Sequence, residues 1–348
     1  MENLSEEQNS IEYVFGKPID PSIIKKGIID GCEMEVKNHN NTASKWLELD
    51  LKRTEACPIC GGNDFKDFVT IRGLKWVSCD NCTHHFAAQY PTSSELARFY
   101  KNHSGDGKLS PYRLEDEKTL KSRMENIDKP KFDSIEAHTQ KPGRWLDIGA
   151  GLGNMLFYAK EKGWDVCGLE LSQHYIDSAK QNFDLNLVKK DLISFVEEDT
   201  PEPFDVVTAL GLLDLIDDPI AALKLMRKVI KDDGLLIVST PNANSFTSKL
   251  TQQWPESEIR SIISVNRSLF TEKSLTYALK QAGFGTFKCW YFGLDFFALF
   301  LHLCIKNKGF ESSSAGDFML RKFSEFQAVI DKNKLSDSMI LYSHVKNS

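Results

Sequence analysis

The stretch "GRWLDIGAGLGNML", residues 143–156, places Gly149, Gly151 and Gly153 within five positions, directly after a short apolar run. Glycine adopts positive φ freely and lets a backbone approach a ligand closely. The apolar run predicts a strand that ends at Asp147, and the residues after the turn predict a helix that ends at Gly163. A strand, a glycine turn and a helix in this order favour a binding turn over a purely structural one.

The chain after residue 143 alternates short apolar runs with helical patterns. This alternation predicts an α/β fold with a doubly wound sheet. Helices are expected to begin after a cap at Ser172 and at Pro219. Residues 293–337 are read as a helical insertion, because structureless loops of that length are rare in compact domains. The predicted strands are "RWLDIG", "WDVCGLEL", "LNLVKK", "FDVVTALG", "GLLIVST", "TFKCWYF" and "SMILYSHVK".

An acidic residue, Glu170, ends the strand that follows the glycine turn. A carboxylate at this spacing suits the two hydroxyl groups of a ribose. The turn itself carries no basic residue that would neutralise a phosphate. A dinucleotide and S-adenosylmethionine both fit these observations.

The segments "LDIGAGLGN", "VCGLELS", "KKDLISF", "FDVVTALGLLDLIDDP" and "GLLIVSTPN" resemble, in order and spacing, the class I S-adenosylmethionine-dependent methyltransferases. The resemblance covers roughly residues 141–292. It implies a Rossmann-like seven-stranded sheet whose last strand is antiparallel, which would suit "SMILYSHVK". It also implies that Asp191 and Leu192 bracket the adenine; a helix N-cap is nearly as good an interpretation of Asp191 and is compatible with binding. The full set of implied cofactor-binding residues is Asp147, Gly149, Ala150, Gly151, Gly153, Glu170, Leu171, Asp191, Leu192, Leu210 and Gly211.

Eight cysteines include two C-x-x-C pairs, "CPIC" and "CDNC", formed by Cys57, Cys60, Cys79 and Cys82. Two such pairs predict a closed tetrahedral Cys₄ site for a structural zinc ion, with a zinc ribbon around it. A redox pair is the rival reading, but redox motifs are not doubled in this way. The expected domains are a poorly defined segment at 1–50, a zinc-ribbon module at 51–100, a helical linker or lid at 101–140, and a methyltransferase domain at 141–348 that contains the insertion.

The net charge of −6 argues against nucleic acid as a partner, and so does the balance of six basic and five acidic residues over 51–100. The apolar run "FFALFLHLCI" is too short to span a bilayer, and the polar N-terminus resembles no secretory signal. A cytoplasmic location is therefore expected. A homo-oligomer stays open.

A second resemblance, based on layout, is to bacterial methyltransferases with "CxxC…CxxC" in front and "FTEKSL…AGF" behind. Its members act on sugars or natural-product intermediates, which implies transfer to an oxygen or carbon of a small molecule. Relatives carry Glu-His where this chain has Asp214-Leu215, and a histidine where it has Asn266. Asp214 is the candidate general base, and a loop carboxylate is the alternative reading. RNA methylation and a catalytically silent cofactor-binding scaffold are the alternative functions.

Overall fold

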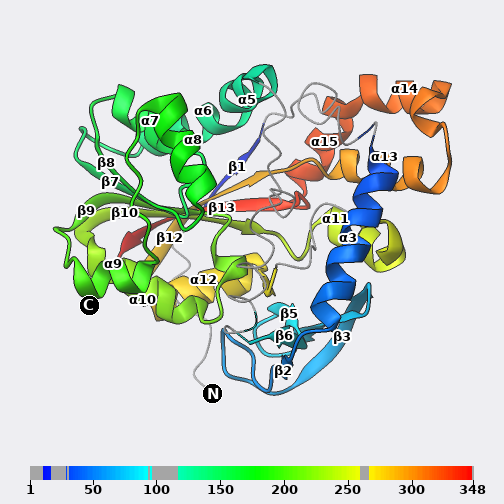
Figure 1. Cartoon of the computed structure of the whole chain (residues 1–348), viewed down its shortest axis with the longest axis horizontal. Coiled ribbons are helices and arrows are strands. Elements are labelled where there is room, and N and C mark those ends of the chain that lie inside the picture. Colours follow the sequence, from blue (N-terminus) through cyan, green and yellow to red (C-terminus); the bar gives the residue numbers. More distant parts are fainter. Residues whose placement is uncertain are drawn as a thin grey trace.

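The computed structural model describes residues 11–16, 29, 31–92, 95, 117–258 and 266–346. Its centre is a seven-stranded sheet in the order β1-β12-β13-β10-β9-β7-β8 (Figure 1). Neighbouring strands from β10 to β8 run parallel, whereas β13 is antiparallel to both β10 and β12. This confirms the predicted fold. The strands are β1 (Glu12–Phe15), β7 (Arg144–Ile148), β8 (Asp165–Leu169), β9 (Phe204–Leu210), β10 (Ile230–Pro241), β12 (Phe284–Phe292) and β13 (Ser338–Val345).

One of the seven predicted strands is wrong. The segment "LNLVKK" makes only an isolated parallel bridge, between Val188 and Leu169. The seventh strand is instead β1, which pairs with β12 at the opposite edge of the sheet. Residues 12–15 thus form a strand within the segment 1–50, which the sequence leaves poorly defined. This strand forms because it pairs with β12, more than 270 residues later in the chain, and its own sequence does not predict that partner.

Helices cover both faces of the sheet (Figure 1). One face carries α5 (Glu117–Arg123), the π-helical turn η1 (Met124–Asp128), α6 (Lys129–Glu136), α7 (Asn154–Glu161) and α8 (Gln173–Phe183). The other carries α9 (Leu192–Glu198), α10 (Pro219–Val229) and α12 (Glu272–Gln281). Strand β10 shows why two layers form: Leu235 and Ile237 enter one core, and Leu236 and Val238 enter the other. Alternate side chains of a central strand point to opposite faces, so both faces must be covered.

The cysteine pairs lie in a small β module, here called the cysteine module and defined as residues 51–92. It contains β2 (Leu51–Arg53), β3 (Phe65–Ile71), β4 (Leu74–Cys79), β5 (His85–Ala87) and β6 (Gln89–Pro91). Its main sheet has the order β11-β5-β4-β3. The edge strand β11 (Ser268–Leu269) lies outside residues 51–92 and comes from a much later part of the sequence. The module packs beneath α12 and beside α3 (Cys32–Leu47) (Figure 1). Helix α3 was not predicted.

Residues between β12 and β13 form α13 (Asp295–Lys306), the short turn η4 (Phe310–Ser312), α14 (Ser314–Arg321) and α15 (Phe323–Lys332). These helices lie to one side of the sheet with α11 (Phe246–Gln253) and the turn η3 (Pro255–Ser257) (Figure 1). Apolar side chains of α13, led by Phe297, Phe300 and Leu301, form their core. No helix among the described residues is long and apolar enough to cross a membrane.

Candidate functional site

The site lies at the edge of the sheet where three parallel strands end. The register pairs Asp147 on β7 with Gly168 on β8 and with Thr208 on β9. The segments that follow these strands are the glycine turn, Glu170 and Gly211. Because the carboxyl ends of parallel strands share one edge, all three leave the sheet together, and this edge is where open α/β sheets bind ligands.

The glycine turn leaves open space at one of its residues. Gly151 has a φ of +54°, and a Cβ added there would meet no heavy atom within 4 Å. Gly211, which follows β9, has a φ of +72° and is equally open. Only glycine holds this backbone without strain and without a side chain in the space. Space is therefore open beside each of these two glycines, at the ends of β7 and β9.

Glu170 ties the glycine turn to the helix that follows it. Its half-buried carboxylate accepts one hydrogen bond from the backbone N–H of Gly151 at 2.9 Å and another from Ser172 at 2.8 Å. Ser172 is the N-cap residue of α8, but its side chain makes no capping bond, so the predicted cap is wrong in this respect. A carboxylate has further lone pairs beyond these two bonds, so Glu170 can still accept hydroxyl donors.

Asp147 is buried beneath the turn and accepts a hydrogen bond from Thr208 Oγ1 at 2.6 Å. Burial raises the pKa of Asp147 to about 7, and the negative charges of Glu170 and Asp128 add to this effect. Asp128, which no sequence pattern indicated, accepts from Asn154 Nδ2 at 2.7 Å. Asn154 Oδ1 is buried and has no hydrogen-bond partner in the described part of the chain. This oxygen, next to the glycine turn, can accept a bond from a ligand donor.

The remaining predicted cofactor contacts differ in exposure. Asp191 caps α9 by accepting from Ser194 N at 2.8 Å, as its alternative reading expected. Leu192 is buried in the core, whereas the next residue, Ile193, is 56% exposed. Leu171 is 62% exposed directly after Glu170. An exposed leucine beside a polar anchor offers an apolar surface to a flat ring, which makes Leu171 a better candidate contact than Leu192.

Asp214 lies in the turn η2 (Leu213–Leu215), three residues after Gly211. Its side chain is only 4% exposed, and its Oδ2 accepts from Asn266 Nδ2 at 2.5 Å. Its Oδ1 has no hydrogen-bond partner among the residues that the structure describes. Burial raises the pKa of Asp214 to about 6, against the opposing effect of its own backbone N–H and of Asn266. Asp214 and Asn266, two of the three positions at which the chain departs from the family pattern, thus contact each other.

Two further acidic residues, Asp217 and Asp218, follow Asp214 directly before α10. Asp218 caps α10 by accepting from Ala221 N at 2.9 Å, and Asp217 forms an ion pair with Arg267. Tyr112 and Arg113, which fall in the predicted linker or lid at 101–140, lie outside the described residues.

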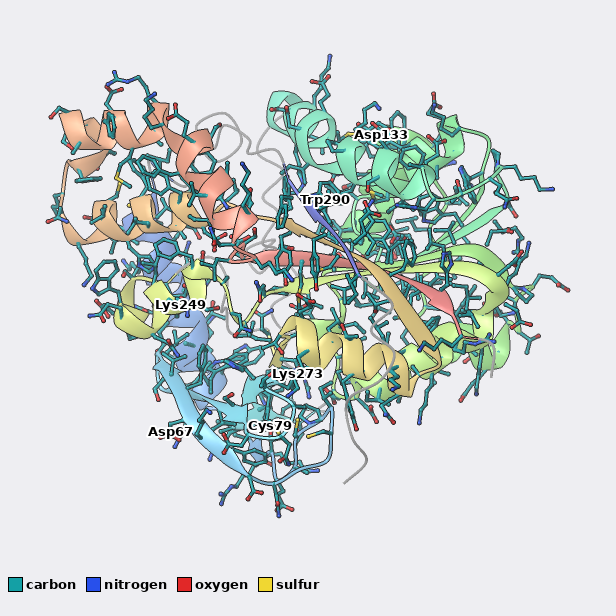
Figure 2. All side chains as sticks on the ribbon, turned by 180° about the vertical axis from the view of Figure 1, so that it is seen from behind. Asp67, Cys79, Asp133, Lys249, Lys273 and Trp290 are labelled. Carbon is teal, nitrogen blue, oxygen red and sulfur yellow. The ribbon has the colours of Figure 1, made fainter. Side chains whose placement is uncertain are left out.

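The four paired cysteines form one cluster in the cysteine module, where Figure 2 labels Cys79. Their sulfur atoms all lie within 4.8 Å of one another, and the Cys57–Cys82 and Cys60–Cys79 sulfur atoms are 3.5 Å apart. Tetrahedral zinc with bonds of about 2.3 Å requires sulfur atoms roughly 3.8 Å apart, so the cluster fits that ion. Four sulfur ligands leave no open coordination position, so such an ion would support structure rather than chemistry.

The central part of the chain is similar to known proteins. Residues 121–286 match the family described as "Methyltransferase domain". A "Ubiquinone biosynthesis O-methyltransferase" of Neisseria meningitidis is 29% identical over 129 residues, which are 35% of this chain and 54% of that protein. The protein of the same description from Coxiella burnetii is 30% identical over 156 residues, 43% of this chain and 60% of that one. The chain thus spans little more than half the length of these relatives.

Among solved structures, magnesium protoporphyrin IX methyltransferase of Synechocystis aligns with a TM-score of 0.47 and 14% identity. The alignment covers 73% of this chain and all of that one. An S-adenosylmethionine-dependent methyltransferase of Archaeoglobus fulgidus aligns with a TM-score of 0.43 and 17% identity, covering 66% of this chain and 99% of that one.

Proposed function

We propose that this chain, whose residues 121–286 match a methyltransferase domain, is a class I S-adenosylmethionine-dependent enzyme that methylates an oxygen or carbon of a small molecule. The observation that carries the proposal is that the glycine turn, Glu170 and the buried Asp214 all follow strands that end at one edge of the sheet. The relatives named as ubiquinone biosynthesis O-methyltransferases favour oxygen as the acceptor atom.

The residues at this edge match the chemical groups of S-adenosylmethionine. Glu170 would accept the two ribose hydroxyls, and Leu171 would cover the adenine. Asn154 Oδ1, which lacks a partner in the described chain, would accept from the amino group. Gly151 and Gly211 leave room for the backbone to approach the ligand. When bound there, S-adenosylmethionine supplies an electrophilic methyl group on a sulfonium.

Asp214 would act as the general base. Its Oδ1 would take the proton from an acceptor hydroxyl as that oxygen bonds to the methyl carbon and the carbon–sulfur bond breaks. General-base assistance of this kind contributes about 10²–10⁴-fold to a rate. The remaining contribution of the chain is to hold donor and acceptor in line.

Acceptor screening tests the proposal directly. The purified chain is incubated with methyl-labelled S-adenosylmethionine and a panel of nucleotide sugars, phenols and hydroxylated metabolites, and labelled products are detected by mass spectrometry. A labelled product from one class, with equimolar S-adenosylhomocysteine, supports the proposal. Labelling of RNA fragments added in parallel would overturn the small-molecule assignment. Cofactor binding without any labelled product would indicate the silent scaffold instead.

Replacing Asp214 by asparagine is expected to lower kcat by about 10²–10⁴-fold, because the amide cannot accept the proton. The affinity for S-adenosylmethionine should remain unchanged, since Asp214 is assigned to the acceptor side. In the unsubstituted protein a base whose pKa is about 6 is active only when deprotonated. The rate should therefore rise with pH through about 6 and level off above it.

The matched control is Asp218→Asn, four residues along the same segment, whose side chain only caps α10. This variant should keep its kcat to within a few fold. A full rate in Asp214→Asn, or a rate that does not change between pH 5 and 7, would remove Asp214 from the mechanism.

A further inference from the structure

The candidate base is held by a chain segment more than 50 residues away. Asn266 Nδ2 donates to Asp214 Oδ2 at 2.5 Å, and the backbone N–H of Arg267 donates to the Asp214 carbonyl at 2.8 Å. Asp214 and Asn266 are both 4% exposed. Two bonds to one residue, one to its side chain and one to its backbone, fix both the position and the rotation of the carboxylate.

This arrangement leaves the other carboxylate oxygen, which is buried, without a hydrogen-bond partner among the described residues. Asn266 engages Oδ2, whereas Oδ1 has no partner in the described parts of the chain. An amide donates a hydrogen bond without bringing a charge. It therefore stabilises the ionised form of the carboxylate less than a cation would. A carboxylate held in this way keeps one oxygen ready to accept a proton.

The cysteine module in turn holds Asn266. Strand β11 begins two residues after it and pairs with β5, Ser268 with Phe86 and Leu269 with His85. The backbone N–H of Ala87 donates to the Arg267 carbonyl at 3.0 Å. The Arg267 guanidinium stacks on the Tyr90 ring at 3.8 Å from its centroid. The module thus supplies the sheet edge on which the segment carrying Asn266 is aligned.

We infer that Asn266 is a positioning residue for Asp214: it anchors Oδ2 so that Oδ1 faces the acceptor, and the pairing of β11 with β5 keeps Asn266 in place. The inference rests on the proposed function in one respect: the positioning serves catalysis only if Asp214 is the general base. The contact itself can be tested without any acceptor, so the two can fail separately.

The test is the titration of Asp214 followed by ¹³C NMR in protein labelled at aspartate carboxyl carbons. The Asp214→Asn variant identifies the Asp214 resonance by its disappearance. In Asn266→Ala the charged form loses a hydrogen-bond donor, so the titration midpoint is expected to move upward by roughly one pH unit. Calorimetry should show unchanged affinity for S-adenosylmethionine.

Asn333→Ala is the matched control, because Asn333 makes a similar amide bond, to the Val329 carbonyl at 2.8 Å, on the exposed end of α15. Its Asp214 midpoint should equal that of the unsubstituted protein. If Asn266→Ala does not fold, the isosteric Asn266→Asp is used instead. The carboxylates at positions 214 and 266 then titrate as a pair, and the higher of their two midpoints should lie more than about one pH unit above the Asp214 midpoint of the unsubstituted protein, because two adjacent carboxylates cannot both ionise readily. A lost donor is expected to move the Asp214 midpoint by about one pH unit. If the midpoint in folded Asn266→Ala stays within about 0.2 pH units of that in the unsubstituted protein, the inference is overturned.

Discussion

Glu170→Ala is expected to weaken the binding of S-adenosylmethionine by about 100-fold. Two hydrogen bonds from ribose hydroxyls to a charged acceptor are worth roughly 1.5 kcal/mol each, which together correspond to that factor. The same carboxylate also accepts from the backbone N–H groups of Gly151 and Ser172, so its loss releases the glycine turn as well. Isothermal titration calorimetry measures the change.

Two further variants separate these contributions. Glu170→Gln keeps the shape and one acceptor oxygen but loses the charge. Its affinity for S-adenosylmethionine should therefore lie between that of the unsubstituted protein and that of Glu170→Ala. Glu161→Ala, at the exposed end of α7, is the control and should bind normally. Thermal melts of the free variants show whether the fold is kept. An affinity within threefold of the original in Glu170→Ala would mean that this carboxylate does not hold the ligand.

Cys79→Ser is expected to abolish stoichiometric zinc binding and to lower the melting temperature by roughly 10 °C. A structural zinc ion contributes directly to folding, and each kcal/mol lost shifts the midpoint of a domain of 150–250 residues by about 2–4 °C. The buried Cys79 also belongs to β4, which pairs with β5, the neighbour of β11. Elemental analysis and scanning calorimetry of reduced protein give the two quantities.

The control for the cluster is Cys167→Ser, a half-buried cysteine on β8 that does not belong to it. This variant should retain one zinc ion per chain. Unsubstituted protein that is purified without chelator and contains almost no zinc would refute the metal site, as would an unchanged melting temperature in Cys79→Ser.

The sequence predicted the features that depend on short-range patterns of residues. The strand before Gly149, the helix after it and the order of most later elements follow from periodicity and turn residues within short windows. The four cysteines are predicted to cluster because their spacing alone brings the two pairs to one ion. Each of these features depends on residues close together in the chain, so the pattern contains the information.

The features that the sequence did not predict depend on contacts between distant segments. Strand β11 has two residues and is a strand only because β5 lies beside it. Strand β1 takes the sheet edge next to β12, while the segment around Val188 forms only a single bridge. The contact between Asp214 and Asn266 had one signal in the sequence: both positions depart from the family pattern, and the departures turn out to be neighbours in space.

The measurement that tests the central claim most directly is a calorimetric titration of the purified chain with S-adenosylmethionine, its demethylated product and NAD. The account predicts binding of the first two with one site per chain, and no heat with NAD. Heat from NAD in place of S-adenosylmethionine, or no heat from any of the three with the folded protein, would contradict it.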